Sequence, residues 1–122
     1  MAENANQILG RLGERLALEH YERRGFRLLE RNWRTRAGEI DLVVRDHATT
    51  VFVEVKTRRS GGLDPLVSID VRKRRRMRVL AAAWLADHPG RPHTLELRID
   101  AVAVVIDARG SLVSLDQVED VA

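Results

Sequence analysis

The sequence contains no cysteine, and of its 21 basic residues only Lys56 and Lys73 are lysines. The absence of cysteine excludes disulfides, thiolate zinc sites and cysteine nucleophiles. The longest uninterrupted apolar run, Val79–Ala86, is far too short to cross a bilayer. The first residues are charged and include no apolar signal region. These absences predict a cytoplasmic protein with no membrane partner.

The composition is that of a globular protein with a basic character. Hydrophobic residues make up 44% of the 122 residues and charged residues 32%, which argues against global disorder. A chain of this length forms one domain with one core, so we expect a single domain over residues 1–122. The net charge is only +3, but the sequence pI is about 10.1 and the basic residues are clustered, which points to an acidic partner such as nucleic acid.

Apolar periodicity predicts two helices, one near the N-terminus and one that ends near residue 90. The first helix runs from about Asn6 to Arg24, and Gly25 supplies its stop. One stripe of this helix is mostly small and would let it approach a neighbouring backbone closely: Gly10, Gly13, Ala17 and Tyr21. The second helix begins after Ser68 as N-cap, with Asp70 in its first turn, and ends at Pro89-Gly90. Its apolar stripe comprises Met77, Leu80, Ala81, Trp84 and Leu85.

The remaining apolar segments are predicted to be strands: Phe26–Trp33, Gly38–Arg45, Val51–Thr57, Leu95–Asp107 and Leu112–Leu115. Short connections favour an antiparallel meander for the first three. The glycine-containing segment Arg58–Pro65 is predicted to be a loop. This order of elements predicts an α/β domain with a central mixed β-sheet flanked by helices.

Charged residues in two neighbouring predicted strands, Gly38–Arg45 and Val51–Thr57, suggest a site. Because strand side chains alternate between faces, Glu54 and Lys56 must share a face, with Val53 and Val55 opposite. By the same rule Glu39 shares a face with Asp41. A register that puts Asp41 beside Glu54 would bring these charges together. Charges in apolar strands are costly unless they are paired or bind a metal.

Two carboxylates with open positions suit Mg²⁺ or Mn²⁺, and the carbonyl of Val55 would complete the ligand set with Asp41 and Glu54. Such a metal lowers the pKa of a bound water and neutralises charge on a phosphate. Lys56 would then place a cation where charge accumulates in phosphoryl transfer. The alternative is a solvated face or a cross-strand ion pair with no catalytic role.

The densest charge run lies at the start of the second helix and comprises Arg72, Lys73, Arg74, Arg75, Arg76 and Arg78. These cations repel one another and gain nothing from the helix dipole at its N-terminal end. We therefore favour a phosphate-contacting surface over a merely solvated helix face. Arg58, in the glycine-containing segment, would extend this surface. The sequence thus predicts a nucleic-acid partner, with DNA favoured.

Asp41, followed thirteen residues later by Glu54-Val55-Lys56, resembles the PD-(D/E)xK signature of restriction-endonuclease-like nucleases. A wider set of residues resembles the bacterial YraN family, which is uncharacterised and predicted to be endonuclease-like. This set comprises Gly10, Gly13-Glu14, Ala17, Asn32, Arg34, Gly38–Leu42, Phe52–Lys56, Arg58, Lys73 and Arg98–Asp100. The layout is also similar to that of archaeal Holliday-junction resolvases.

The resemblance implies a restriction-endonuclease-like fold, with Asp41 and Glu54 as metal ligands and Lys56 as the catalytic cation. Glu14 would be the acidic helical residue that joins the site in the resolvases. Ile40 stands where the motif has its proline. The expected function is a Mg²⁺-dependent endonuclease acting on structured or double-stranded DNA. Its alternatives are a non-catalytic nucleic-acid-binding module and a protein-interaction role, for example as a homodimer.

Asp100 has two interpretations from the sequence. It stands in a strongly apolar predicted strand, where it is either an additional site residue or the partner of Arg98 on the same face.

Overall fold

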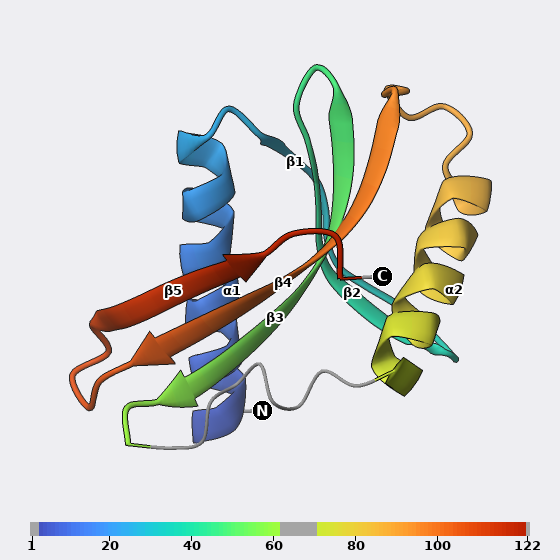
Figure 1. The fold of residues 1–122 in the computed structure, drawn as a ribbon. Coiled ribbons are helices and arrows are strands. Elements are labelled where there is room, and N and C mark those ends of the chain that lie inside the picture. The colour runs from blue at the N-terminus through green and yellow to red at the C-terminus, as the bar shows by residue number, and fades with distance from the viewer. Residues whose placement is uncertain (1–2, 62–70, 122) are drawn as a thin grey trace.

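A five-stranded mixed sheet with a helix on each face forms the fold in the computed structural model, which describes residues 3–61 and 71–121 (Figure 1). In chain order the elements are α1 (Ala5–Arg23), β1 (Arg27–Thr35), β2 (Gly38–Arg45), β3 (Thr49–Arg59), α2 (Val71–Asp87), β4 (Glu96–Ile106) and β5 (Leu112–Val118). The strand order is β1-β2-β3-β4-β5, with β3 and β4 parallel and the other pairs antiparallel. The α/β class, the mixed sheet and the meander of the first three strands are confirmed.

Helix α1 begins and ends at local signals in the sequence. The Asn4 side chain accepts a 2.8 Å hydrogen bond from the Gln7 backbone N–H, and the Gln7 side chain accepts one of 3.0 Å from the Asn4 N–H. This reciprocal pair satisfies amides that the first turn leaves without helical partners. After Arg24, Gly25 adopts a φ of +91°, a conformation that glycine reaches without steric cost.

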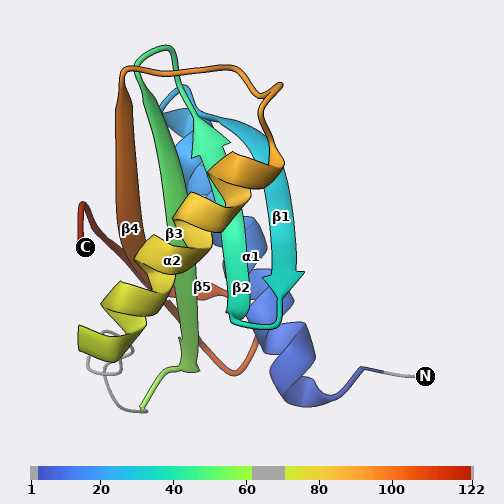
Figure 2. The ribbon, with the colours of Figure 1, turned by 90° about the vertical axis from the view of Figure 1, so that its right-hand side faces the viewer.

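The two helices cover opposite faces of the sheet, as Figures 1 and 2 show. On the α1 face, Ala17, Leu18 and Tyr21 are buried against valine, leucine and isoleucine side chains of β2, β3 and β4. On the α2 face, the side chains of Met77, Leu80, Ala81 and Trp84 form a second core with Ile40, Val43, Phe52 and Ile99. The apolar stripe predicted for the second helix is therefore confirmed. Neither helix in the described part of the chain has the length and apolar character to cross a membrane.

Several predicted strands were too short, because pairing with neighbours extends strands beyond their own pattern. β3 continues to Arg59, which pairs with Ile106 of β4, so the loop predicted from Arg58 begins too early. β1 runs to Thr35 and β5 to Val118, where the predicted strands ended at Trp33 and Leu115. The predicted N-cap residues Ser68 and Asp70 lie outside the described residues.

The sheet divides at one end into a fork between β2 and β3. The ladder between these strands runs from Arg45↔Thr50 to Leu42↔Val53 and goes no further. Beyond that point β2 stays paired with β1, whereas β3 stays paired with β4. Figure 1 shows the two halves diverging below the centre of the sheet.

Strand alternation breaks where the fork begins. Ile40 packs into the α2-side core and Leu42 into the α1-side core, although residues two apart in a regular strand share a face. The backbone therefore turns at Asp41, where β2 leaves β3. The prediction that Glu39 and Asp41 share a face rested on unbroken alternation, and this premise is wrong at Asp41.

Candidate carboxylate site at the fork of the sheet

Asp41 occupies the apex of the fork. Its Oδ2 accepts a 2.7 Å hydrogen bond from the backbone N–H of Val55, and the residue is only 8% exposed. Because the β2–β3 ladder stops at Leu42 and Val53, the amide of Val55 has no partner in β2. A buried amide without a partner is costly, and the Asp41 carboxylate replaces the missing strand. The divergence of the sheet thus fixes where this carboxylate lies.

Glu54 and Lys56 extend from β3 on the α2 side of the sheet. Glu54 Oε1 lies 3.4 Å from Lys56 Nζ, and the two side chains are 19% and 26% exposed. Val53 and Val55 pack on the opposite, α1 side. The parity predicted for these four residues is confirmed.

Glu14 reaches the fork because α1 lies unusually close to β3. A Cβ at Gly13 would stand 1.8 Å from Thr57 Oγ1, so no larger residue fits there without movement. The predicted close approach of the small-residue stripe is confirmed at this point. The Glu14 carboxylate lines a cavity together with the Asn32 side chain of β1, which acts to lower its pKa. Arg11, one turn earlier in α1, forms an ion pair with Glu3.

The carboxylates around the fork interact electrostatically. Burial is the main cause that raises the pKa of Asp41 to about 7, and the nearby charges of Glu14, Glu39 and Glu54 act in the same direction against the opposing hydrogen bond from Val55. Burial likewise raises the pKa of Glu14, with a contribution from Glu39. The fork therefore concentrates negative charge that the described protein groups only partly neutralise.

The two lysines of the chain meet at this site. Burial by itself would lower the pKa of Lys56, but the carboxylates of Glu54 and Asp41 raise it above its ordinary value. Lys73 lines the adjacent cavity together with Glu54. Lys56 therefore stays a cation at neutral pH and is not suited to act as a general base. A lysine ammonium is a compact point charge, whereas an arginine guanidinium is a planar fork.

The donor atoms at the fork fit a hard divalent cation. Asp41 and Glu54 offer carboxylate oxygens, and the crowding of negative charge would be relieved by a bound cation. Among residues 3–61 and 71–121, no three His, Cys, Asp or Glu side chains are grouped so as to hold an ion by themselves. Mg²⁺ commonly binds one or two protein carboxylates and keeps several waters, and its presence at the fork stays a prediction. The contact seen at Val55 is through its N–H, and the ligand role of its carbonyl stays a prediction.

The basic residues at the start of α2 do not form one face. Lys73 and Arg76 line a cavity of about 230 Å³ together with Glu39 and Glu54. Arg58 lies two residues beyond Lys56 and is exposed, so alternation directs it to the same side. By helical spacing Arg72 shares the face of Arg76, whereas the other three point elsewhere around the helix: Arg74, Arg75 and Arg78. All four of these arginines are exposed. The predicted phosphate surface thus has a part at the fork and a part turned away from it.

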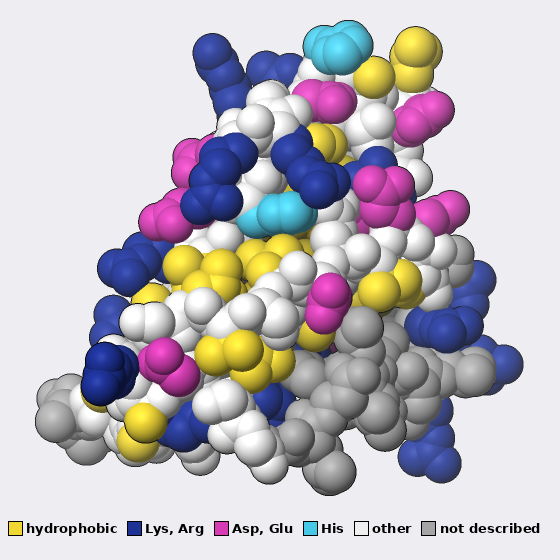
Figure 3. Space-filling model, turned by 60° about the vertical axis from the view of Figure 1, so that its left-hand side comes forward, with side chains coloured by type: hydrophobic (Ala, Val, Ile, Leu, Met, Phe, Trp, Pro, Cys, Tyr) yellow, Lys and Arg dark blue, Asp and Glu magenta, His cyan; other side chains and the backbone are white. Residues whose placement is uncertain are grey.

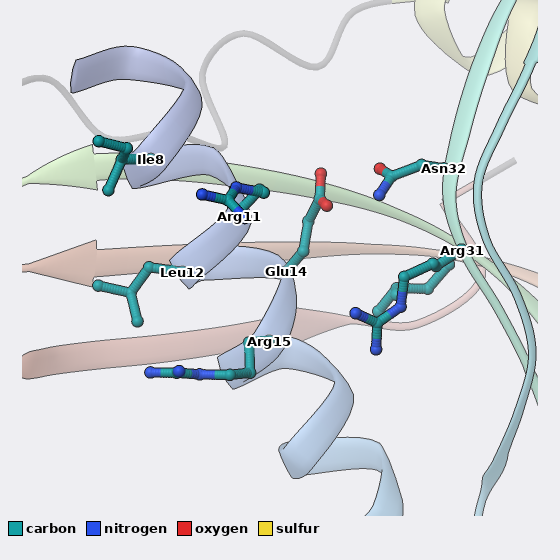
Figure 4. A pocket seen from close by; sticks show the side chains of 8 residues that line it. Ile8, Arg11, Leu12, Glu14, Arg15, Arg31 and Asn32 are labelled. Carbon is teal, nitrogen blue, oxygen red and sulfur yellow. The ribbon is translucent and has the colours of Figure 1, made fainter. Parts of the chain in front are cut away.

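Two cavities lie between α1 and β1 on the other side of the fork. The larger, of about 360 Å³, is shown in Figure 4 and is lined by Arg11, Glu14, Arg15, Arg31 and Asn32 with apolar neighbours. The second, of about 250 Å³, shares Arg11, Glu14 and Asn32 and continues toward Glu39. Together they form a groove, here called the α1–β1 groove, which ends at the acidic residues of the fork.

Asp100 lies in a hydrogen-bond network within the molecule. Its fully buried carboxylate accepts hydrogen bonds from Tyr21 at 2.7 Å, from Arg98 at 2.8 and 3.0 Å and from Gln117 at 3.0 Å. The pairing with Arg98 considered from the sequence is what the structure shows. Sequence reasoning missed Tyr21 as a partner because the two residues are 79 positions apart.

Asn32 was absent from the predicted site residues, although it contacts Glu14 directly. Asn32 has a left-handed backbone, with a φ of +51°. The sequence carried a weak signal of this, since asparagine is among the few residues that accept such a conformation.

The outer surface near β5 combines apolar and charged side chains. Leu112, Val113 and Val118 of this edge strand are 45%, 56% and 39% exposed. Figure 3 shows hydrophobic, basic and acidic side chains intermixed on the face that it presents. No large surface of one kind identifies an interface among the described residues there, and the homodimer considered from the sequence stays a prediction.

Fold and site together define an α/β protein with a carboxylate and lysine cluster where a mixed sheet divides. Comparison with known proteins identifies its family: the uncharacterised protein family UPF0102 matches residues 13–104, and the chain belongs to it. The UPF0102 protein of Corynebacterium efficiens is 49% identical over 116 residues, which are 94% of this chain and 92% of the relative. The relative from Streptomyces griseus is 47% identical over 112 residues, covering 91% and 93%.

A third relative, from Acidothermus cellulolyticus, is 46% identical over 111 residues and 84% of each chain. UPF0102 is the YraN-like family, so the predicted resemblance to the uncharacterised YraN family is confirmed. The family name states no activity, so the similarity to endonucleases and resolvases stays a prediction.

Proposed function

We propose that this protein is a Mg²⁺- or Mn²⁺-dependent endonuclease that hydrolyses phosphodiester bonds in structured or double-stranded DNA. The observation that carries the proposal is the fork, where the buried Asp41 carboxylate lies next to the Glu54 and Lys56 pair. A protein that only needed to fold would be more stable with a neutral acceptor at position 41, which would accept the Val55 N–H without burying a charge. Retention of an ionisable group with so perturbed a pKa favours a functional role.

Each residue of the site has a distinct task in this proposal. Asp41 and Glu54 hold the cation, and Glu14 adds a third carboxylate from α1 on the groove side. When bound, Mg²⁺ supplies an activated water and neutralises charge on the phosphate. Lys56, held as a cation beside Glu54, stabilises the negative charge that develops on the phosphate oxygens.

Basic residues beside the site support a nucleic-acid substrate. Lys73 and Arg76 share a cavity with Glu54, and Arg58 extends along β3 from Lys56. A phosphodiester backbone contacting these cations would place one phosphate next to the carboxylates. Such contacts are independent of sequence and weaken with salt, which agrees with a substrate recognised by its structure.

The direct test is cleavage of labelled four-way-junction and duplex DNA with Mg²⁺ or Mn²⁺. We expect cleavage by the native protein, and a loss of roughly a hundredfold or more for Glu54→Gln and for Lys56→Met, which remove a charge with little change in size. Glu22→Gln, at an exposed position of α1, is the matched control and should cleave like the native protein. If no substrate is cut with either metal, the proposal is wrong.

A non-catalytic nucleic-acid-binding module is the second candidate. It is supported by the exposed arginines of α2 that point away from the fork, such as Arg74, Arg75 and Arg78. This candidate predicts DNA binding that weakens steeply with salt, falls when α2 arginines are replaced and is unchanged in Glu54→Gln. A protein that leaves DNA unbound at physiological salt would instead support the protein-interaction role.

A further inference from the structure

Asn32 has an unusual backbone conformation for a residue within a strand. Its φ is +51°, and Asp120 is the only other non-glycine residue with positive φ in the described part of the chain. A left-handed conformation in the middle of β1 interrupts regular pleating. Strained residues of this kind persist where the surrounding structure holds them, and they cluster at functional sites.

Asn32 lies opposite the apex of the fork. Arg31 pairs with Leu42 and Trp33 with Ile40, which sets Asn32 across from Asp41 in the β1–β2 ladder. Alternation breaks at both positions. Arg31 lines the α1–β1 groove, whereas Trp33 packs against the α2-side core, although a regular strand would put both on one face. The irregularity of β1 thus coincides with that of β2.

The consequence of this irregularity is a contact with α1. Figure 4 shows Asn32 and Glu14 pointing toward one another across the groove. The two side chains line the same cavity, and the Asn32 amide acts to lower the pKa of Glu14. Because a carboxylate only accepts, the N–H₂ of Asn32 is the group that faces it as donor. Three cations line the same groove, Arg11, Arg15 and Arg31, and the charge of Arg31 acts on this carboxylate.

We propose that Asn32 is a positioning residue that holds the Glu14 carboxylate toward Asp41 and away from the arginines of the groove. The proposal rests on the proposed function, since it assigns Glu14 to the cation site. Glu14 has a flexible side chain on a helix, and a neutral amide can orient it without cancelling its charge. An arginine in the same place would pair with the carboxylate and weaken its attraction for a cation.

The test uses Asn32→Gly, because glycine adopts positive φ freely and only the amide is lost. The probe is Mn²⁺ alone, with its dissociation constant measured by isothermal titration calorimetry. Residues that orient a metal ligand commonly contribute tenfold to a hundredfold in affinity, and we expect Mn²⁺ binding to weaken by about that factor. Asp120→Gly is the matched control, since it makes the same kind of change at the other left-handed residue, and it should bind as the native protein does.

A second pair of variants separates positioning from general damage to the fold. In the Glu14→Gln background, Asn32→Gly should have no further effect on Mn²⁺ affinity, because the residue acts through Glu14. An equal loss in both backgrounds would overturn the proposal, as would native affinity in Asn32→Gly. A Glu14→Gln variant with native affinity would also overturn it, while leaving the proposed function standing if Glu54→Gln no longer binds. Failure of the native protein to bind Mn²⁺ would overturn both.

Discussion

At the scale of single residues, Asp41 reconciles two opposing requirements. Its carboxylate satisfies the Val55 amide that the fork leaves without a strand partner. The same carboxylate is buried and close to other acidic groups, which raises its pKa from 3.8 to about 7. Ionised Asp41 therefore destabilises the folded protein in the absence of a cation. Such a cost is typical of a site arranged for a ligand of opposite charge.

The pH dependence of stability follows from this shift. The folded state holds the Asp41 proton up to about pH 7, whereas the unfolded chain loses it near 3.8. The contribution of Asp41 to the free energy of unfolding is thus fully present below pH 3.8 and is lost as the pH rises through about 7. We expect Asp41→Asn, which keeps an acceptor for the Val55 N–H, to flatten the fall in unfolding free energy over this range. At about pH 8 the unfolding free energy of Asp41→Asn should be higher than that of the native protein by roughly a few kcal/mol.

Urea unfolding at several pH values measures this effect, with Asp116→Asn on exposed β5 as the control. Glu14 contributes a smaller fall of the same sign, so some slope should remain in Asp41→Asn. Added Mg²⁺ should raise the stability of the native protein near neutral pH and leave that of Asp41→Asn little changed. If the unfolding free energies of the native protein and of Asp41→Asn run parallel with pH, Asp41 is not the group that causes the fall in stability.

At the scale of elements, the position of α1 depends on one missing methyl group. Gly13 faces Thr57, where a Cβ would lie 1.8 Å from the Oγ1 atom and 2.9 Å from the Cβ and Cγ2 atoms. This contact sets how far Glu14 reaches toward the fork. At Gly10, one turn earlier, an added methyl group would meet no atom within 4 Å.

We expect Gly13→Ala to lower the free energy of unfolding by roughly 1–3 kcal/mol, because the helix and β3 must separate. Gly10→Ala is the matched control in the same helix and should raise stability by up to about 1 kcal/mol through helix propensity. Urea denaturation measures both. If the two variants change stability alike, the close approach of α1 to β3 is not what Gly13 provides.

The two sides of α2 lead to a separate prediction about DNA. Arg76 lines the cavity beside Glu54, whereas Arg75 points away from it by helical spacing. We expect Arg76→Ala to reduce the slope of log affinity against log salt by about 0.9, the contribution of one phosphate contact to duplex DNA. Arg75→Ala should change the slope much less.

Fluorescence anisotropy of labelled duplex, with EDTA present to prevent cleavage, gives this salt slope. The two variants remove the same charge from adjacent positions, so their net charge is identical. Equal slopes for both would mean that α2 binds DNA through its outer surface or only through its overall charge.

At the scale of the whole molecule, the Asp100 network joins distant parts of the chain. The buried carboxylate connects Tyr21 of α1, Arg98 of β4 and Gln117 of β5, and it also accepts a 3.1 Å bond from the Asp120 backbone N–H. Burial and the nearby Asp100 raise the pKa of the Tyr21 hydroxyl, which remains a donor. The network ties α1 and the C-terminal segment to the central sheet.

Removal of this carboxylate should destabilise the fold without affecting the fork. We expect Asp100→Ala to cost roughly 3–5 kcal/mol, because it leaves the Arg98 charge without its buried partner. Tyr21→Phe should cost about 1 kcal/mol, the contribution of a single hydrogen bond. Denaturant unfolding measures both losses, and Mn²⁺ affinity below the unfolding transition should be native. If Asp100→Ala lost Mn²⁺ affinity while keeping native stability, Asp100 would be a residue of the metal site.

The sequence alone determined the elements and part of the site, because the forces that decide them are local. Helix caps, the spacing of apolar residues and strand alternation act over a few positions. They suffice to predict both helices, the mixed sheet and the shared face of Glu54 and Lys56. Strand ends were less predictable, since β3 extends to Arg59 through pairing with β4.

Only the tertiary structure decided where the carboxylates meet. The fork arises because β2 and β3 each keep a different neighbour, and alternation along either strand gives no sign of it. Glu14 reaches Asn32 from another element, and Asp100 finds Tyr21 across most of the chain. These contacts depend on the packing of segments far apart in sequence, so residue types could suggest the chemistry of the site while its geometry required the fold.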